Sequence, residues 1–305
     1  MAMQWDKVTE DEIIQHCLRS NPNRDVISEL DGGLSVIRIS EGAVVKCGFG
    51  VSQLEAANQQ RAYEILDPAI VRVPRVYRFF AHGFHGYIIM EHINGQPLSS
   101  IINPDAYLEP MAKVLKHFEQ VQRARPGPFH ESVAFGQLWL DYDLIAPTTI
   151  SDVEQYYNKR QLKNSTHITL AGYPLVLCHL DIAPRNILVL EGGSLCLVDW
   201  ISGGFYPRLF ERTALKINIR KEGDWNTKLL RLLDKFDEDE KAQARLLEQA
   251  YYLGQRYIYR IHEFKPQPPP GMNPPKKSKR VAASRKREQA GTNNEREEGL
   301  KKDTN

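Results

Sequence analysis

The chain has 305 residues and a mass of 35.0 kDa, with 42% hydrophobic and 26% charged residues. This balance excludes a wholly disordered protein, and the length fits one large domain or two modest ones. Of its 40 Lys and Arg residues, 11 lie after residue 264, whereas only 5 of its 38 Asp and Glu residues lie there. The net charge of +2 therefore combines a mildly acidic body with a basic tail.

The cysteine pattern and the absence of targeting features predict a cytoplasmic protein. Four widely spaced cysteines form no CxxC pair, which is typical of reduced intracellular thiols. The first residues lack the order of a signal peptide. No apolar run is long enough to form a membrane helix, so we expect no membrane span.

The first part of the chain predicts a small antiparallel sheet with one helix. Three β-rich runs over 25–48 are separated by turn dipeptides, which favours a meander. A helix is predicted over 52–66, because its apolar residues recur at helical spacing and Asp67-Pro68 ends it. Further strands are predicted over 71–80 and 86–91, followed by a turn at Asn94-Gly95.

The rest of the body is predicted to be mostly helical. A helical pattern begins at Tyr107, and the later elements are short strands over 175–178, 187–190 and 195–198 and helices over 225–236 and 238–261. Residues 265–305 are rich in Pro and in like charges, which predicts disorder. The predicted organisation is a helical extension (1–24), an N-terminal nucleotide-binding lobe (25–95), a C-terminal catalytic and acceptor-binding lobe (96–264) and a disordered tail.

The segment over 176–200, VLCHLDIAPRNILVLEGGSLCLVDW, contains the strongest chemical motif. Asp181 and Asn186 have the Asp-x4-Asn spacing of a kinase catalytic loop, in which Asp is the catalytic base and Asn holds magnesium. Asp199 ends the next strand and occupies the place of the second magnesium ligand. His179 is expected to brace the loop. Each of these residues alone is also compatible with a loop or strand-end role, and it is their order together that favours phosphoryl transfer.

A kinase-type site also requires a lysine that neutralises phosphate charge and a carboxylate that positions this lysine. Lys46 ends the strand AVVK, and the following helix offers Glu55 and Glu64. We favour Glu55, because the first turns of that helix lie nearest the lysine.

The remaining nucleotide contacts are predicted from the ends of strands. The run over 87–93, YIIMEHI, suits the connector on which adenine docks, with Met90 at the back of the pocket and Glu91 and Ile93 at the connector. The loop over 31–35 lacks a GxGxxG pattern but could cover the phosphates with backbone N–H groups and the Ser35 hydroxyl. A buried strand followed by a turn is an equally consistent interpretation of 87–95.

These residues, with the stretch CHLDIAPRNIL…LCLVDWISGGFYPRLFE, make the chain resemble the aminoglycoside phosphotransferase and choline kinase-like superfamily, and most of all its fungal small-molecule kinase-like members. The resemblance covers about residues 30–262 and is specific over 176–211. It implies an α+β, protein-kinase-like, two-lobed fold, with ATP and Mg²⁺ as cofactors and phosphorylation of a small-molecule hydroxyl. Two positions depart from the family pattern: Leu180 stands where Gly is frequent, and Ile201 where an acidic residue is frequent.

Two other functions compete with a kinase. Cys47-Gly48-Phe49-Gly50 imitates the start of a dinucleotide-binding fingerprint, but Gln53 replaces its third glycine and the preceding strands read as hairpins. A catalytically silent module that binds nucleotide or a partner would keep the same polar residues. ATP turnover that depends on magnesium would separate the second alternative from an enzyme.

The sequence gives weaker signals for the acceptor-binding residues and for the role of the tail. Trp139, Asp141, Asp143, Tyr156 and Tyr157 could form a pocket for a cationic acceptor, although ordinary core and surface roles are favoured. Residues 274–288 resemble a nuclear localisation signal. We expect no nucleic-acid binding except through this basic tail.

Overall fold

A computed structural model describes residues 6–30, 33–130, 132–140, 143–161, 166–219 and 223–258. Contacts divide the chain into two units, Met1–Tyr257 and Ile258–Asn305, and both lobes of the fold belong to the first. The predicted tail and its nuclear-signal segment lie outside the described residues, as do Asp31, Gly32 and Asp141. In the described part of the chain, no helix is both long enough and apolar enough to span a membrane.

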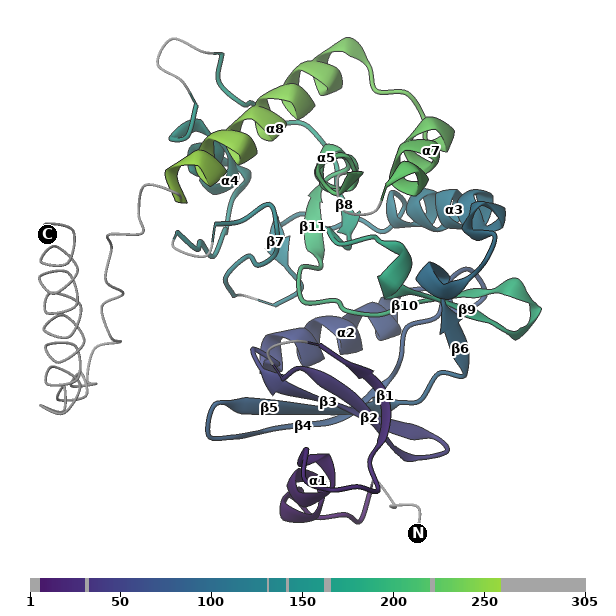
Figure 1. The fold of residues 1–305 in the computed structure, drawn as a ribbon. Coiled ribbons are helices and arrows are strands. Elements are labelled where there is room, and N and C mark those ends of the chain that lie inside the picture. The colour runs from purple at the N-terminus through teal and green to yellow at the C-terminus, as the bar shows by residue number, and fades with distance from the viewer. Residues whose placement is uncertain are drawn as a thin grey trace, which may run out of the picture. The chain divides into compact units, whose positions relative to one another are not determined.

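The first lobe is built from one five-stranded sheet and two helices (Figure 1). Its elements are α1 (Glu10–Cys17), β1 (Asp25–Glu29), β2 (Ser35–Ser40), β3 (Ala43–Phe49), α2 (Gln53–Ile65), β4 (Val76–His82) and β5 (His85–Glu91). Neighbouring strands are antiparallel in the order β1-β2-β3-β5-β4. This pairing excludes a βαβ dinucleotide-binding unit at Cys47–Gly50, which would need parallel strands.

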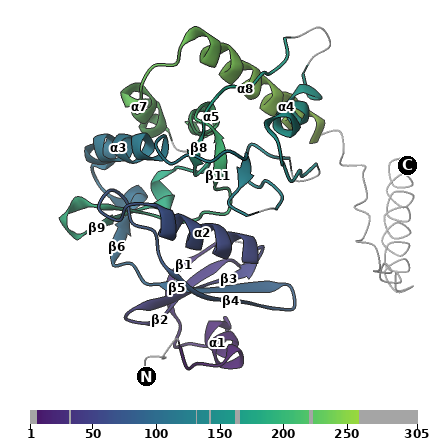
Figure 2. The ribbon, with the colours of Figure 1, turned by 180° about the vertical axis from the view of Figure 1, so that it is seen from behind.

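The two faces of this sheet are covered by different helices, as Figures 1 and 2 show. Residues of β2, β3 and β5 pack with Ile13 of α1 on the outer face. On the other face, Val44, Ile88 and Met90 pack with Ala56 of α2. Both helices begin at a side-chain cap: Thr9 and Glu12 form a reciprocal capping box for α1, and the Ser52 hydroxyl accepts from Glu55 N–H for α2.

The second lobe contains most of the helices and two small sheets. Its elements are β6 (Gly95–Pro97), α3 (Leu108–Phe118), β7 (Gly127–Pro128), α4 (Ile150–Asn158), β8 (Leu175–Cys178), β9 (Ile187–Leu190), β10 (Leu195–Leu197), β11 (Gly204–Pro207), α5 (Leu209–Ile217), α7 (Asp224–Leu232) and α8 (Glu238–Ile258). The sheets have the strand orders β10-β9-β6 and β7-β11-β8. Trp200 is fully buried in the larger hydrophobic cluster, which includes residues of α3, β8, β9 and β10. The α+β class expected from the sequence is confirmed.

Several predicted elements need correction. Asn94-Gly95 is not a turn, because Gly95 begins β6 and pairs with Leu190. A Cβ on Gly95 would lie 2.8 Å from Leu190 Cδ2, so glycine permits the close approach of two strands. The strand predicted over 71–80 begins only at Val76, since Pro74 lacks the N–H that a ladder needs. The helix predicted to reach Phe236 ends at Leu232.

Candidate functional site

Lys46 connects the two lobes through its ammonium group. It lies on β3 opposite Val36 and Ile88, and only 9% of its surface is exposed. Its Nζ donates to Glu55 Oε1 of α2 and, over 3.2 Å, to Asp199 Oδ1 in the second lobe. Burial opposes the charge, but Asp199 and Glu55 outweigh it and raise the pKa of Lys46. Glu64, the other predicted candidate, instead pairs with Arg61 at the surface, 3.0 Å away.

The loop between β8 and β9 holds the carboxylate of Asp181 from several directions. Arg185 Nη2 lies 2.6 Å from Oδ1 and 2.8 Å from Oδ2, and the Asn186 Nδ2 amide donates to Oδ2 at 2.9 Å. The same amide also bonds the Asp181 carbonyl at 2.9 Å. Asn218, one residue beyond α5, approaches Oδ1 at 3.4 Å. These contacts fix the side chain that the sequence predicts to be the base.

His179 braces this loop from within the core. The imidazole is fully buried, and its ring centroid lies 4.5 Å from that of Trp200. Because Nδ1 accepts the Asp181 N–H at 3.3 Å, the proton of the neutral ring is on Nε2 and is donated to the Val198 carbonyl at 3.1 Å. Burial lowers the pKa of His179, which keeps the ring neutral. His179 is therefore a positioning residue that joins the loop to the segment before Asp199.

A buried carboxylate that the sequence did not reveal supports the same loop. Glu211 Oε2 of α5 accepts the N–H of His179 at 2.5 Å and that of Leu180 at 3.0 Å. Burial raises the pKa of Glu211 to about 7, although these two hydrogen bonds oppose the increase. Leu180 itself has φ of 63°, a left-handed conformation that costs an L-residue about 1–2 kcal/mol. The carboxylate thus binds the backbone at a residue in a strained, left-handed conformation.

The residues proposed for magnesium provide oxygen ligands of the right kind. Because the Asn186 amide nitrogen faces Asp181, its amide oxygen is the atom that could coordinate a cation, and Asp199 has a second carboxylate oxygen besides the one that Lys46 contacts. Within the described ranges, no group of three or more His, Cys, Asp or Glu side chains could hold a metal. One carboxylate and one amide fit Mg²⁺, which keeps several waters and takes phosphate oxygens as further ligands.

The predicted adenine connector lies between β5 and β6. Met90 is on the same sheet face as Lys46, where its sulfur accepts from Gln59 Nε2 at 3.2 Å. The Glu91 carboxylate is bound to Arg72 at 2.6 Å, so its side chain holds the connector in place. Ile93 is buried and belongs to neither strand, which leaves it in the segment where backbone groups could pair with a base.

Asn58 of α2 forms a second link between the lobes. Its Nδ2 is close to three carbonyl oxygens of one segment of the second lobe, those of Trp200 and Ile201 at 3.2 Å and that of Gly203 at 3.5 Å. Asn58 is fully buried. It therefore fixes the backbone just after Asp199 from the opposite lobe.

The sequence from residue 28 to residue 247 matches the phosphotransferase enzyme family (APH). The chain belongs to this family. A comparison with curated proteins finds no match.

Solved structures show which fold this family member shares. A thermostable mutant of aminoglycoside phosphotransferase APH(4)-Ia in its apo form has 14% identity and a TM-score of 0.52, over 78% of this chain and 87% of that one. Aminoglycoside-3′-phosphotransferase of type VIII has 16% identity and a TM-score of 0.50, over 79% and 98%. Choline kinase LicA from Streptococcus pneumoniae has 15% identity and a TM-score of 0.45, over 85% and 93%. The first two confirm the kinase-like fold expected from the sequence.

One residue predicted to contact the nucleotide, Ser35, does not lie with the other predicted site residues. Ser35 faces Cys47 across the β2–β3 pair, whereas Lys46 faces Val36. Since alternate residues of a strand point to opposite faces, the Ser35 side chain lies on the face away from Lys46. Its hydroxyl is buried and donates to Glu29 Oε1 at 3.3 Å. The structure does not bring it together with the other site residues.

The aromatic residues considered for an acceptor pocket form part of the core. Trp139, Tyr156 and Tyr157 are buried, with ring centroids 5.0–5.4 Å apart. Asp143 is bound by Lys159, 2.7 Å away, and by Arg160. These residues support the core role that the sequence favoured.

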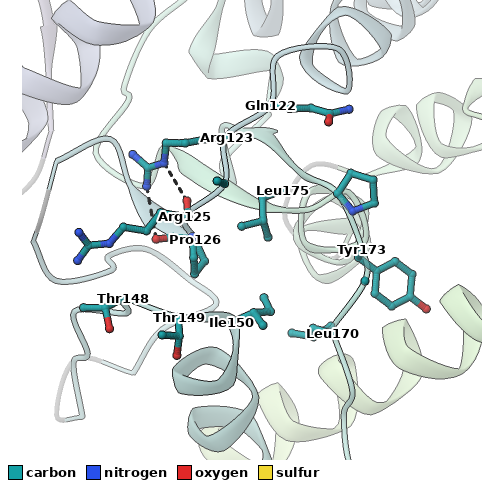
Figure 3. Close-up of a pocket in the computed structure, with 13 residues that line it drawn as sticks. Gln122, Arg123, Arg125, Pro126, Thr148, Thr149, Ile150, Leu170, Tyr173 and Leu175 are labelled. Atoms are coloured by element: carbon teal, nitrogen blue, oxygen red, sulfur yellow. Dashed lines mark hydrogen bonds between the residues drawn. The ribbon is translucent and has the colours of Figure 1, made fainter.

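A pocket of about 780 Å³ beside β8 contains none of the predicted site residues (Figure 3). The Arg123 guanidinium on its wall donates to the carbonyls of Arg125 at 2.8 Å and Pro126 at 3.4 Å. The hydroxyl of Tyr173 bonds Asp239, and the Thr149 hydroxyl caps α4. These polar groups are used in contacts that hold the fold.

Proposed function

We propose that this family member is an enzyme that transfers the γ-phosphoryl group of ATP to a hydroxyl of a small molecule. The observation that carries the proposal is the ion pair between Lys46 on β3 and Asp199 in the second lobe, at 3.2 Å. Residues far apart in the chain meet there, and the Asp181 loop is joined to the same segment through His179 and Val198. A lysine, a metal-binding carboxylate and a base are the set that phosphoryl transfer needs.

The proposed reaction uses Asp181 as the base. The carboxylate accepts the proton of the acceptor hydroxyl, the acceptor oxygen forms a bond to the γ-phosphorus, and the bond from that phosphorus to the β–γ bridging oxygen breaks to release ADP. Lys46 neutralises phosphate charge, and Glu55 keeps the ammonium in place. When bound by Asn186 and Asp199, Mg²⁺ would neutralise the charge of the phosphates.

Two variants test this assignment with the full chain. Asp181→Ala should lower turnover by about 10²–10⁴-fold, the usual contribution of a general base, and leave ATP binding largely intact. Asp199→Ala should instead weaken Mg·ATP binding by at least about tenfold, as expected when a metal ligand is lost. Asp224→Ala is the control, since this carboxylate is exposed on α7. Turnover retained by Asp181→Ala would refute the assignment of the base.

A silent nucleotide- or partner-binding module is the competing function. One observation favours it, because Arg185 contacts both oxygens of Asp181 and an acceptor hydroxyl would have to share or displace this arginine. An ATP-consumption screen across amino alcohols, aminoglycosides, sugars and hydroxy-amino acids separates the two functions. Consumption that a magnesium chelator abolishes supports the enzyme, whereas ATP binding without turnover on any acceptor supports the module.

A further inference from the structure

One face of α2 holds both partners of the ion pair that joins the lobes. Glu55 binds the Lys46 ammonium, and Asn58, three positions later on the same helix, binds carbonyls of the segment that follows Asp199. Residues three apart in a helix lie on the same face. Together with the 3.2 Å contact between Lys46 and Asp199, these bonds form a closed ring. Through this ring α2 fixes the ammonium and the backbone that carries the carboxylate.

The backbone of Asp199 needs such support. Its φ is 68°, a left-handed conformation that residues with a side chain adopt far less readily than glycine. Strained residues of this kind persist where the surrounding structure holds them. The Asn58 amide binds directly after Asp199, where the carbonyls of Trp200 and Ile201 both lie 3.2 Å from its Nδ2. The Trp200 carbonyl also accepts the Gly203 N–H at 3.0 Å, so the conformation is held both by this turn and by α2.

Asn58 acts on the site through Asp199 rather than by contact with a ligand. Its exposed fraction is 0%, so a bound nucleotide or ion does not reach it, whereas the Asp199 side chain is 34% exposed. The Asp181 carboxylate is held by other contacts, from Arg185 and from the Asn186 amide. Loss of the Asn58 amide should therefore disturb the proposed metal ligand more than the proposed base.

We propose that Asn58 is a positioning residue that sets the affinity of the site for Mg·ATP. This inference rests on the proposed role of Asp199 as a metal ligand. Because the Asn58 amide keeps the Asp199 backbone in place before the complex binds, less ordering is needed on binding. Groups that orient a metal ligand typically contribute about 10–100-fold to metal affinity. ATP without a metal makes no use of this ligand, so Asn58 should matter for the metal complex alone.

Isothermal titration calorimetry of the full-length protein tests this role. ATP is titrated into the parent protein and into Asn58→Ala, once with excess Mg²⁺ and once with a chelator in place of the metal. We expect Asn58→Ala to raise the Kd for Mg·ATP about 10–100-fold and to leave the Kd for metal-free ATP nearly unchanged. An unchanged Kd for Mg·ATP, or an equal weakening with and without Mg²⁺, would overturn the proposal.

Asn226→Ala is the matched control, because Asn226 of α7 is also a fully buried asparagine. Its Nδ2 donates to the Leu215 carbonyl at 3.0 Å, and its Oδ1, like that of Asn58, has no partner in the described structure. Both alanine variants should lower the melting temperature, since each leaves a buried carbonyl without its amide. Asn58→Leu, which has nearly the shape of asparagine, repeats the test without a large cavity. A similar loss of Mg·ATP affinity in Asn226→Ala would attribute the effect to destabilisation and refute the positioning role.

A double variant shows whether Asn58 acts through Asp199. Asp199→Ala alone should weaken Mg·ATP binding, and Asn58→Ala added to it should weaken binding little further, because residues that act as a unit are not additive. Losses that add in full would mean that Asn58 acts by another route, and the proposal would fail.

The same titrations separate a failure of this inference from a failure of the proposed function. If Asp199→Ala leaves the Kd for Mg·ATP unchanged, the proposed metal ligand is wrong and the positioning role of Asn58 falls with it. If Asp199→Ala weakens Mg·ATP binding but Asn58→Ala does not, only the positioning role is overturned. Because binding is measured rather than turnover, the result does not depend on phosphoryl transfer.

Discussion

Glu211 should make the stability of the protein depend on pH in a way that one substitution removes. The residue is 5% exposed, and its Oε2 accepts the backbone N–H groups of His179 and Leu180. Its other oxygen is buried without a hydrogen-bond partner in the described structure. Glu211→Gln keeps an oxygen acceptor for the loop and nearly the same side-chain shape, but it cannot ionise. The comparison therefore measures the effect of the charge alone.

The magnitude follows from the shift in pKa. Burial raises the pKa of Glu211 from its ordinary 4.5 to about 7, and each pKa unit is worth about 1.4 kcal/mol. Below pH 4.5 both the folded and the unfolded chain carry the proton, and the contribution to stability is complete. As the pH rises, the unfolded chain ionises first, so the contribution falls and is lost once the pH passes 7. The full change is about 3 kcal/mol.

Urea unfolding of both proteins at pH 4.5, 5, 6, 7 and 8 measures this effect. Groups that titrate alike in the two proteins cancel in the difference between their free energies of unfolding. We expect that difference to shift in favour of Glu211→Gln by up to about 3 kcal/mol between the ends of a pH 4.5–8 range. Glu10→Gln, an exposed position on α1, is the control and should show little shift. A difference that stays constant with pH would refute the reasoning.

Three further substitutions probe the loop and the sheets. Leu180→Gly should be more stable than Leu180→Ala by about 1 kcal/mol, because both variants lose the buried side chain but only glycine removes the left-handed strain. Urea unfolding that finds the Leu180→Ala variant more stable would contradict this. Arg185→Gln should lower kcat about tenfold with little change in the KM for Mg·ATP, since Asp181 loses two orienting hydrogen bonds. If Arg185 instead served nucleotide binding, steady-state kinetics would show a higher KM for Mg·ATP and little change in kcat. Gly95→Ala should lower the free energy of unfolding by about 1–3 kcal/mol, because its Cβ would overlap Leu190, and an unchanged chemical-denaturation midpoint would show that β6 does not need the close approach.

Sequence patterns predicted those elements whose signals are local. The strands Leu175–Cys178 and Ile187–Leu190 have the predicted bounds, and the helix predicted over 52–66 spans Gln53–Ile65. Compact apolar runs and a serine cap mark these elements within the chain itself. By contrast, β11 (Gly204–Pro207) contains both a glycine and a proline, and it becomes a strand because β7 and β8 pair with it on either side.

The candidate site likewise combines residues that the sequence could predict with residues that only the tertiary contacts reveal. The order Asp-x4-Asn and the later Asp199 were readable, because phosphoryl transfer requires those residue types at those places. Glu211 was not, since its role depends on a contact with a backbone 32 positions away. The available signal was a carboxylate in RLFERTAL, where the neighbouring helix residues are buried. Ser35 was predicted from its loop, and only the register of β2 against β3 reveals that it faces the other way.

The contacts of Asn58 have a consequence for how the specificity of such an enzyme could evolve. The amide holds the carbonyls of Trp200, Ile201 and Gly203, and a backbone carbonyl is present whatever side chain position 201 carries. The path of the chain after Asp199 is therefore secured independently of that side chain. A substitution at Ile201 can change the chemistry offered beside Asp199 without displacing this carboxylate, the proposed metal ligand, so position 201 is free to diverge while Lys46 and Asp199 keep their contact.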